Sequence, residues 1–373
     1  MLNKLTNILS KKTKGIGIEI TPEKIKLVQL NKKGQQYKLV KYCSEEIPEE
    51  IFEEGQIADA PRLAEVIQEM LKTNKIKAKE VATAVPMRES IIRVIPIPAE
   101  LDDKELNDMV LNHEAGLYLP YPTEECDLDY QKLGYFVDED GIEKVQVLLV
   151  ATRKEVTDLY LETFAQAGLV VNVLEINSFA LLRTVREQLR QFTATEAVVL
   201  VDIEFDSTEI AIIVEGVPQF SRTVPIGTYQ LNSALAQAMN LPITRNTEML
   251  QEITVPTAPE GHGTSGSTTS TGQTWINPGM AALLRVLGEL VDELRRSINF
   301  YLNQSDGVEV AQVFLAGPGG GLGQLDEFFT KKLNLPALHI DPVTSMGVET
   351  TVEIPAGDRT GLGTALGLGM RMI

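Results

Sequence analysis

The chain has 373 residues and is 43% apolar, so it can bury a large core and is expected to divide into two or more domains. Its 52 acidic and 34 basic residues give a net charge of −18, which argues against duplex DNA or RNA as a partner. Two cysteines and three histidines are too few for a disulfide framework or a structural metal site, which fits a reducing cytoplasm. No apolar run approaches the roughly 20 residues that a membrane helix needs.

The first fourteen residues are basic, with leucine and isoleucine at helical spacing, but their apolar part is too short for a secretory signal. We consider two interpretations of this segment. It is either a frayed terminus or a segment that makes weak contact with a membrane surface or a partner. From Gly15 the pattern predicts three strands, GIGIEI, KIKLVQL and QYKLVKYCSEEI. A helix at about 60–74 and a strand in EVATAVP are expected next.

Residues 88–173 are predicted to form a small α+β insertion, bracketed by pieces of a larger fold. The pattern indicates six elements, which are a strand at 90–95, a helix at 102–117, strands at 127–136 and 143–151, a helix at 154–167 and a strand at 169–175.

After a helix at about 178–191, the segment from residue 196 repeats the pattern of the first strands. Both copies run apolar strand, acid, short polar turn, apolar strand, with Glu19 and Asp202 as the matched acids. The copies are separated by about half of the chain. We therefore expect an internal duplication, with two similar sheets that face each other and acidic turns that converge.

A stretch rich in glycine, serine and threonine, 254–277, is expected to be a mobile loop, and an amphipathic helix follows at about 278–304. The run FLAGPGGGLGQLDEFF at 314–329 then places five glycines between a strand and a helix start. Its spacing fits neither GxxxxGK[ST] nor GxGxxG. The N–H groups of such a turn make a positive concavity that a ligand can approach closely, although a plain connector is the alternative. A helix of small residues ends the chain.

The two acidic turns and the glycine turn could close around a nucleotide. Glu19 and Asp202 would hold Mg²⁺ through water or orient an attacking water, and Lys26 could neutralise phosphate. In the segment DELRRS, arginines could stack on adenine and a carboxylate could bond ribose. Solvated turn acids and a solvated helix face are the alternatives for these residues.

The order of these pieces resembles the actin-like ATPase superfamily, and within it the PilM family of type IV pilus assembly proteins, related to the cell-division protein FtsA. The most specific pieces are ELRRSINFY (293–301), VDIEFDST (201–208) and LYLPYPTEECDLDY (117–130). The resemblance implies an α/β protein with a duplicated actin-like (ribonuclease H-like) fold and an FtsA-type inserted α+β subdomain.

The resemblance also implies where the subdomains lie. Subdomain 1A would comprise 1–87, 174–194 and 345–373, and the inserted subdomain 1C would comprise 88–173. Subdomain 2A would comprise 195–227 and 306–344, and subdomain 2B 228–305 with the mobile loop 254–277.

A site for ATP and Mg²⁺ is a further implication of the resemblance. The first phosphate loop would run from Glu19 through Thr21 to Lys26, and the second from Asp202 through Ser207 to Thr208. Asp202 is the candidate catalytic residue, and Glu19 and Asp202 would hold Mg²⁺ through water. The adenosine side would be formed by Asp292, Glu293, Arg295, Arg296, Gly317, Gly319, Gly320 and Gly321.

This chain departs from the family pattern at Thr21 and Glu204, where the family usually has glycine. A Cβ at either turn narrows the room for a phosphate, and the Glu204 carboxylate repels one unless a cation lies nearby.

The implied function is that of a cytoplasmic, ATP-binding scaffold with weak or absent ATPase activity. It would bind the cytoplasmic N-terminal tail of the membrane protein PilN in a groove involving the insertion. It would thereby link pilus motor ATPases to the inner-membrane PilN–PilO complex, as a ring or another homo-oligomer, peripheral to that membrane. The alternatives are a filament-forming FtsA-like cytoskeletal ATPase and, less favoured, a small-molecule kinase.

Overall fold

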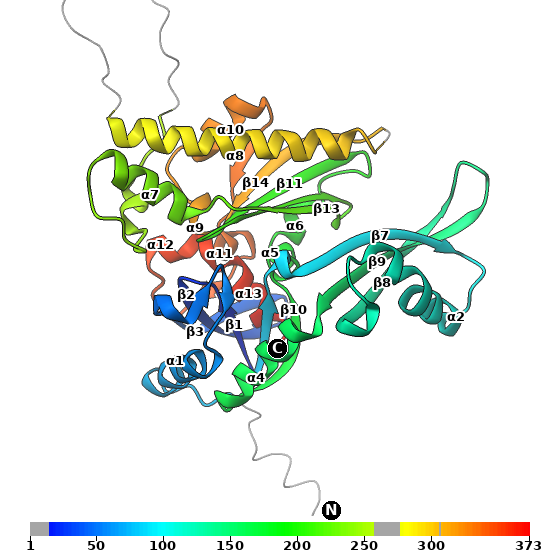
Figure 1. Ribbon diagram of the computed structural model, residues 1–373, viewed down its shortest axis with the longest axis horizontal. Helices are drawn as coiled ribbons and strands as arrows, with labels where there is room; N and C mark the ends of the chain where they lie inside the picture. Colours follow the sequence, from blue (N-terminus) through cyan, green and yellow to red (C-terminus); the bar gives the residue numbers. More distant parts are fainter. Residues whose placement is uncertain (1–14, 257–276, 306) are drawn as a thin grey trace, which may run out of the picture. The chain divides into compact units, whose positions relative to one another are not determined.

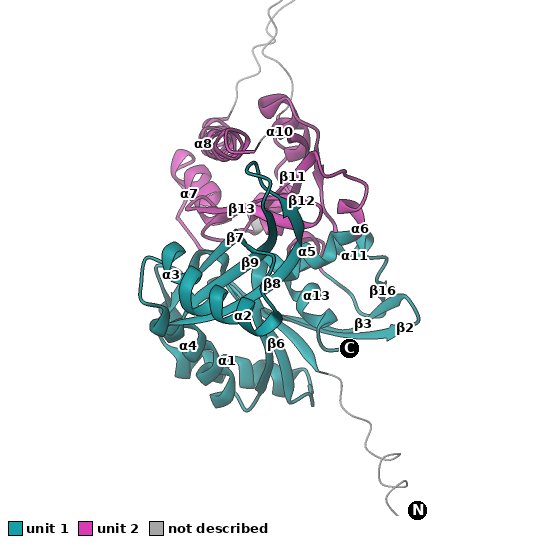
Figure 2. Ribbon diagram, turned by 90° about the vertical axis from the view of Figure 1, so that its right-hand side faces the viewer, with its two compact units in different colours: residues 1–186, 342–354, 362–373 teal, residues 187–341, 355–361 magenta. Residues whose placement is uncertain are grey.

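The computed structural model describes residues 15–256, 277–305 and 307–373. The basic terminus and most of the predicted loop 254–277 lie outside the described residues. The chain forms two compact units. Unit 1 contains residues up to 186 together with 342–354 and 362–373, and unit 2 contains 187–341 and 355–361 (Figure 2).

Unit 1 is built on a six-stranded mixed sheet with the strand order β10–β6–β1–β2–β3–β16. Figure 1 labels β1, β2, β3 and β10 of this sheet. The first three strands of the chain pair antiparallel, and β6 and β10 are added parallel to β1. All five residues of β1 are buried, as a central strand requires. The strands are β1 (Ile16–Ile20), β2 (Lys24–Lys33), β3 (Gln36–Glu46), β6 (Glu80–Val85), β10 (Val170–Ile176) and β16 (Glu349–Thr350).

Helices cover both faces of this sheet. On one face α1 (Ala60–Thr73) and α4 (Lys154–Gln166) pack against the isoleucines of β1. On the other face, α13 (Gly363–Met370) packs against β2, and α5 (Asn177–Thr184) packs against β6. The predicted helix at 178–191 is divided, because α5 ends at Thr184 and the short α6 (Arg186–Leu189) follows.

The insertion forms its own antiparallel sheet, β7–β9–β8, with its own apolar core. Its elements are β7 (Ser90–Pro98), α2 (Asp103–Asp108), a π-helical turn (Met109–Glu114), α3 (Ala115–Tyr118), β8 (Cys126–Val137) and β9 (Glu143–Arg153). The predicted insertion at 88–173 also included α4 and β10. The structure shows that β10 is a strand of the main sheet, where it pairs with β6, and that α4 packs in the core beside α1.

Unit 2 is built on a five-stranded sheet with the order β13–β12–β11–β14–β15. Three strands again pair antiparallel, and two more are added in parallel to the first of them. This is the pairing pattern of unit 1, so the predicted internal duplication is confirmed. The strands are β11 (Glu196–Ile203), β12 (Thr208–Val214), β13 (Val217–Val224), β14 (Glu309–Ala316) and β15 (Ala337–His339).

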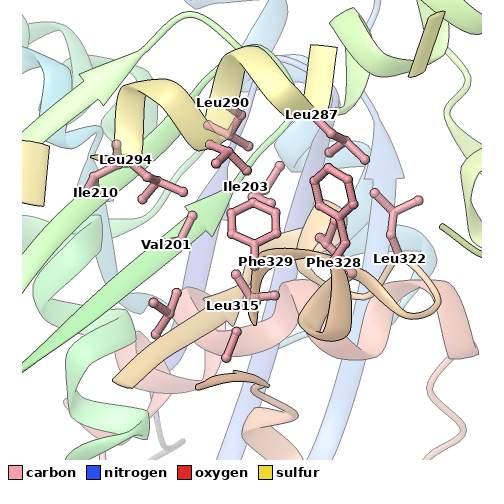
Figure 3. Close-up of a cluster of buried hydrophobic side chains, with 14 of the residues drawn as sticks. Val201, Ile203, Ile210, Leu287, Leu290, Leu294, Leu315, Leu322, Phe328 and Phe329 are labelled. Carbon is pink, nitrogen blue, oxygen red and sulfur yellow. The ribbon is translucent and has the colours of Figure 1, made fainter. Parts of the chain in front are cut away.

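The core of unit 2 lies between this sheet and its helices. Leu287, Leu290 and Leu294 of α8 pack in one cluster with Phe328 and Phe329 of α10 (Figure 3). The helices are α7 (Thr228–Ala238), α8 (Pro278–Leu302) and α10 (Leu325–Leu333), with the short α9 (Gly317–Gly320) and α12 (Ala356–Arg359).

The remaining helices and strands are short. They are β4 (Phe52–Glu53), β5 (Gln56–Ile57) and α11 (Pro342–Ser345), with 3₁₀ turns at η2 (Glu49–Ile51), η3 (Met87–Glu89), η5 (Thr123–Glu125), η6 (Glu248–Glu252) and η7 (Thr360–Leu362). Within the described ranges, every helix is too short or too polar to span a membrane.

Candidate functional site

The first predicted phosphate loop is the turn between β1 and β2. Glu19 and Lys26 are cross-strand neighbours, and Lys26 Nζ lies 3.4 Å from Glu19 Oε2. Both residues are buried. The Thr21 hydroxyl closes the turn, because it donates to the Lys24 carbonyl and accepts from the Lys24 N–H, at 3.1 Å each. One hairpin therefore brings these three predicted residues together.

The carboxylate of Glu19 is held inside unit 1. Burial raises its pKa, and the charge and hydrogen bond of Lys26 oppose that rise. Hydrogen bonds with the Ala365 backbone and the Thr364 side chain, at the start of α13, also favour the charged form. Glu19 therefore also helps to join β1 to α13.

The second predicted phosphate loop is the turn between β11 and β12. Asp202 is buried near the end of β11, and the N–H of Glu204 donates to the Ser207 carbonyl at 2.9 Å. The Ser207 hydroxyl donates to Asp206 Oδ1 at 3.0 Å. The Thr208 hydroxyl donates to the Ile226 carbonyl at 2.6 Å, so the hydroxyls of both predicted ligands make hydrogen bonds within unit 2.

The two hairpins differ at one matched position, which sequence analysis missed. Glu19 pairs with Lys26, whereas Asp202 pairs with Glu209, and all four side chains are buried. In unit 1 a lysine therefore lies beside the acid, whereas in unit 2 a second carboxylate occupies the matched position. Aligning the second strand of each repeat would have identified Glu209, because it lies at the same distance from its acid as Lys26.

The two departures from the family pattern do not strain the backbone. Neither Thr21 nor Glu204 is among the described residues with positive φ. The backbone at both turns is therefore open to any L-residue. Compared with glycine, each of these two residues adds a side chain to its turn. The Thr21 side chain forms hydrogen bonds that close its own turn.

The glycine turn lies directly against Asp202. Gly317 has φ +77°, and a Cβ there would lie 2.5 Å from Asp202 Oδ1 and 2.6 Å from the Ile203 carbonyl oxygen. A Cβ on Gly319 would meet the Ile203 side chain, and one on Gly321 would lie 2.7 Å from Thr360 Oγ1. A Cβ on Gly320 would lie 3.0 Å from the carbonyl carbon of Leu315. The missing Cβ atoms therefore let the turn pack closely against β11, β14 and Thr360 of the same unit. Ligand binding by the glycine turn stays a prediction.

The arginine-bearing segment of α8 makes ion pairs and hydrogen bonds with β13 and α10. Arg295 pairs with Asp292 at 2.9 Å and donates to the Lys332 carbonyl at 2.8 Å, near the end of α10 and about 10 Å along that helix from its start. Glu293 pairs with Arg296, and with Arg222 of β13 at 2.8 Å. Strand β13 is three strands, roughly 14 Å, from β14, which leads into the turn. That this segment and the glycine turn form one adenosine site stays a prediction.

A pocket of about 320 Å³ lies in unit 1, where the main-sheet elements meet the two ends of the insertion. One wall is the β4–β5 hairpin and another is the start of α4. The lining residues of the pocket are Gly55, Gln56, Ile57, Pro86, Glu89, Arg153, Glu155, Val156, Leu159 and Tyr160. The sequence pattern did not predict this pocket, because its lining residues come from separate segments of the chain.

The pocket combines apolar walls with a few fixed charges. Tyr160 is buried, and burial raises the pKa of its hydroxyl. Arg153 pairs with Glu155, and its guanidinium lies 5.9 Å from the centre of the Tyr121 ring. Gln56 donates to Glu89 Oε1 at 3.2 Å. A hollow that combines apolar walls with placed polar groups is typical of ligand sites.

Among the described residues, no cluster of three or more histidine, cysteine, aspartate or glutamate side chains could hold a metal ion.

Comparison with known proteins identifies the family. Residues 17–256 match the family described as type IV pilus assembly protein PilM. The chain belongs to this family. The solved structure of a PilM–PilN type IV pilus biogenesis complex is similar to the chain, with a TM-score of 0.78 and 26% identity over 96% of this chain and 98% of that chain.

Two more distant structures are also similar to this PilM-family chain. Ethanolamine utilization protein EutJ from Carboxydothermus hydrogenoformans has a TM-score of 0.50 and 13% identity, over 99% of this chain and 96% of that one. MreB5 of Spiroplasma citri bound to ADP has a TM-score of 0.48 and 10% identity, over 89% and 94%. The predicted fold class, a duplicated actin-like fold with an inserted α+β subdomain, is confirmed for the chain.

Proposed function

We propose that this PilM-family protein binds the cytoplasmic N-terminal tail of PilN in the pocket of unit 1. The observation that carries the proposal is the pocket itself, which combines elements of the main sheet with both ends of the insertion. The similar solved structure is a complex of PilM with PilN, which supports this partner. Bound in this way, the protein would act in the cytoplasm, peripheral to the inner membrane, and link the pilus motors to the PilN–PilO complex.

The lining suits a short extended peptide. Ile57, Val156 and Leu159 offer apolar surface for its side chains. Glu89 and Arg153 offer one acceptor and one donor group for its backbone or its charged ends. A volume of about 320 Å³ accommodates a few side chains. The pocket would therefore bind a short motif of the PilN tail, and the rest of the tail would stay outside it.

The test is a titration with a synthetic peptide of the PilN N-terminal tail. Leu159→Gln should weaken the affinity at least about tenfold, because an apolar contact with the peptide is replaced by a buried amide. Leu161→Gln is the matched control, since Leu161 lies on the same helix, is 42% exposed and does not line the pocket. Absence of saturable binding by the wild-type chain, or equal affinity of both variants, would refute this assignment.

We also propose that unit 2 binds ATP with Mg²⁺ near Asp202. Asp202 and Glu209 are buried carboxylates on facing strands, a donor set that fits a hard cation, and Gly317 lies against Asp202. The metal would neutralise phosphate charge when bound. Glu19, Thr21 and Lys26 remain predicted ligands, and Lys26 would have to exchange its contact with Glu19 for phosphate. Slow or absent hydrolysis is part of this proposal. The hydroxyls of Ser207 and Thr208 donate within the protein, so contact with phosphate would have to replace those hydrogen bonds.

A further inference from the structure

The β4–β5 hairpin that walls the peptide pocket has little structure of its own. Its strands have two residues each, paired as Phe52 with Ile57 and Glu53 with Gln56. A hairpin this short is not stable by itself in water. Its turn residues, Glu54 and Gly55, have φ of +50° and +78°, the left-handed pair of a tight two-residue turn. What fixes this wall must therefore come from elsewhere in unit 1.

The base and the tip of the hairpin are held by different forces. At the base, Ile57 is buried in the main core and Phe52 packs against that core. At the tip, the Arg88 guanidinium donates to the Gly55 carbonyl, and Gln56 donates to Glu89 at 3.2 Å. Apolar contact thus anchors the base, while polar bonds from two consecutive residues position the tip.

Arg88 and Glu89 belong to η3, the turn that joins β6 to the first inserted strand, β7. Their side chains lie 3.8 Å apart and are 21% and 13% exposed. Glu89 lines the pocket, whereas Arg88 does not. Arg88 therefore contacts the hairpin without lining the pocket itself. It lies at the point where the chain enters the insertion.

We propose that the hairpin tip, Glu53–Gln56, is a movable flap of the pocket and that Arg88 is the positioning residue that holds it closed. This inference rests on the proposed binding of the PilN tail. Arginine suits the role because its planar fork can bond a carbonyl and a carboxylate at once. Without Arg88, the Gly55 carbonyl loses this donor, the tip opens more often, and a bound peptide leaves sooner.

The first test measures the flap without any peptide. In the full chain, Arg88→Ala should speed amide hydrogen exchange in residues 52–58 about tenfold and leave exchange in β6 unchanged. Arg62→Ala is the control, because Arg62 is an exposed arginine of α1 that pairs with Glu65 at 2.6 Å. Unchanged exchange in 52–58 on loss of Arg88 overturns the proposal.

The second test measures dissociation of the PilN tail peptide. Arg88→Ala should raise the dissociation rate about tenfold and change the association rate less than twofold, and Arg88→Lys, which keeps one donor, should restore part of the loss. A wild-type dissociation rate in Arg88→Ala overturns the inference and leaves the proposed function standing. No binding by the wild-type chain refutes the proposed function, and the exchange experiment then still decides whether Arg88 positions the flap.

Discussion

At the residue scale, Glu19 and Asp202 occupy matched positions in two copies of one sheet, yet their neighbours differ. Lys26 offsets the charge of Glu19, whereas Glu209 adds a second negative charge beside Asp202. Carboxylates that face each other away from water favour a bound cation or proton between them. This contrast makes the hairpin of unit 2 the better candidate for the metal.

The proposed metal position can be tested with two conservative variants. Asp202→Asn should weaken the affinity for Mg-ATP at least about tenfold, because one charged ligand of the cation is lost. Asp292→Asn should change it less than about twofold, since Asp292 pairs with Arg295 at the far end of α10 from the glycine turn. Equilibrium dialysis with and without Mg²⁺ measures both. Equal losses in the two variants would support Asp292 as part of the predicted adenosine site, and no binding by the wild-type chain would refute a nucleotide site.

At the element scale, glycines in α13 allow close packing against neighbouring backbone. A Cβ on Gly367 would collide with the Ala180 carbonyl of α5, and a Cβ on Gly369 would lie 2.8 Å from Val28 Cγ2 of β2. Helix α13 therefore approaches both α5 and the sheet closely because it has glycine at these contact positions. The same property explains why a helix of low amphipathicity is fully buried over most of its length.

Two glycine substitutions test this packing in opposite directions. Gly367→Ala should lower the free energy of unfolding by about 2 kcal/mol or more, because α13 has to move away from α5. Gly288→Ala should raise it by about 1 kcal/mol, because Gly288 is inside α8 with nothing within 4 Å of an added Cβ. Urea unfolding measures both. A Gly367→Ala variant as stable as the wild type would contradict the tight contact.

Element by element, the amphipathic stripe of α8 predicted a long helix but not which end meets the glycine turn. Figure 3 shows Leu287 on the side of Leu322 and Phe328, and Leu294 on the side of Ile210. The first half of α8 is therefore nearer to the turn than the arginine-bearing second half. An apolar stripe predicts which face of a helix is buried. It does not predict which neighbours each turn of the helix contacts, because that depends on how the sheet and α10 pack against it.

At the scale of the whole molecule, the duplication gives each unit its own sheet and core. The cluster around Leu290 lies within unit 2, and the cluster around Leu63 lies within unit 1. A chain with two separate cores is expected to lose local structure in one unit before the other.

Core truncations test this separation. Leu290→Ala should cost about 2–5 kcal/mol and speed hydrogen exchange in β11–β13, with exchange in β1–β3 unchanged, because Leu290 is fully buried in the core of unit 2. Leu63→Ala should give the converse pattern. Uniformly faster exchange through both sheets in either variant would show that the chain unfolds as a single unit.

The sequence by itself carried the resemblance to the family in a few motifs. Its hydrophobic periodicity predicted the internal duplication and most of the elements, because that periodicity records which face of each segment is buried. The sequence also predicted the insertion, although β10 is a strand of the main sheet and α4 packs in its core. Tertiary structure alone decided which side chains meet. It gathered the pocket from the β4–β5 hairpin, η3, the end of β9 and α4, and it set Glu209 beside Asp202. The pocket depends on long-range packing, which no local pattern encodes, whereas an alignment of the two repeats would have pointed to Glu209.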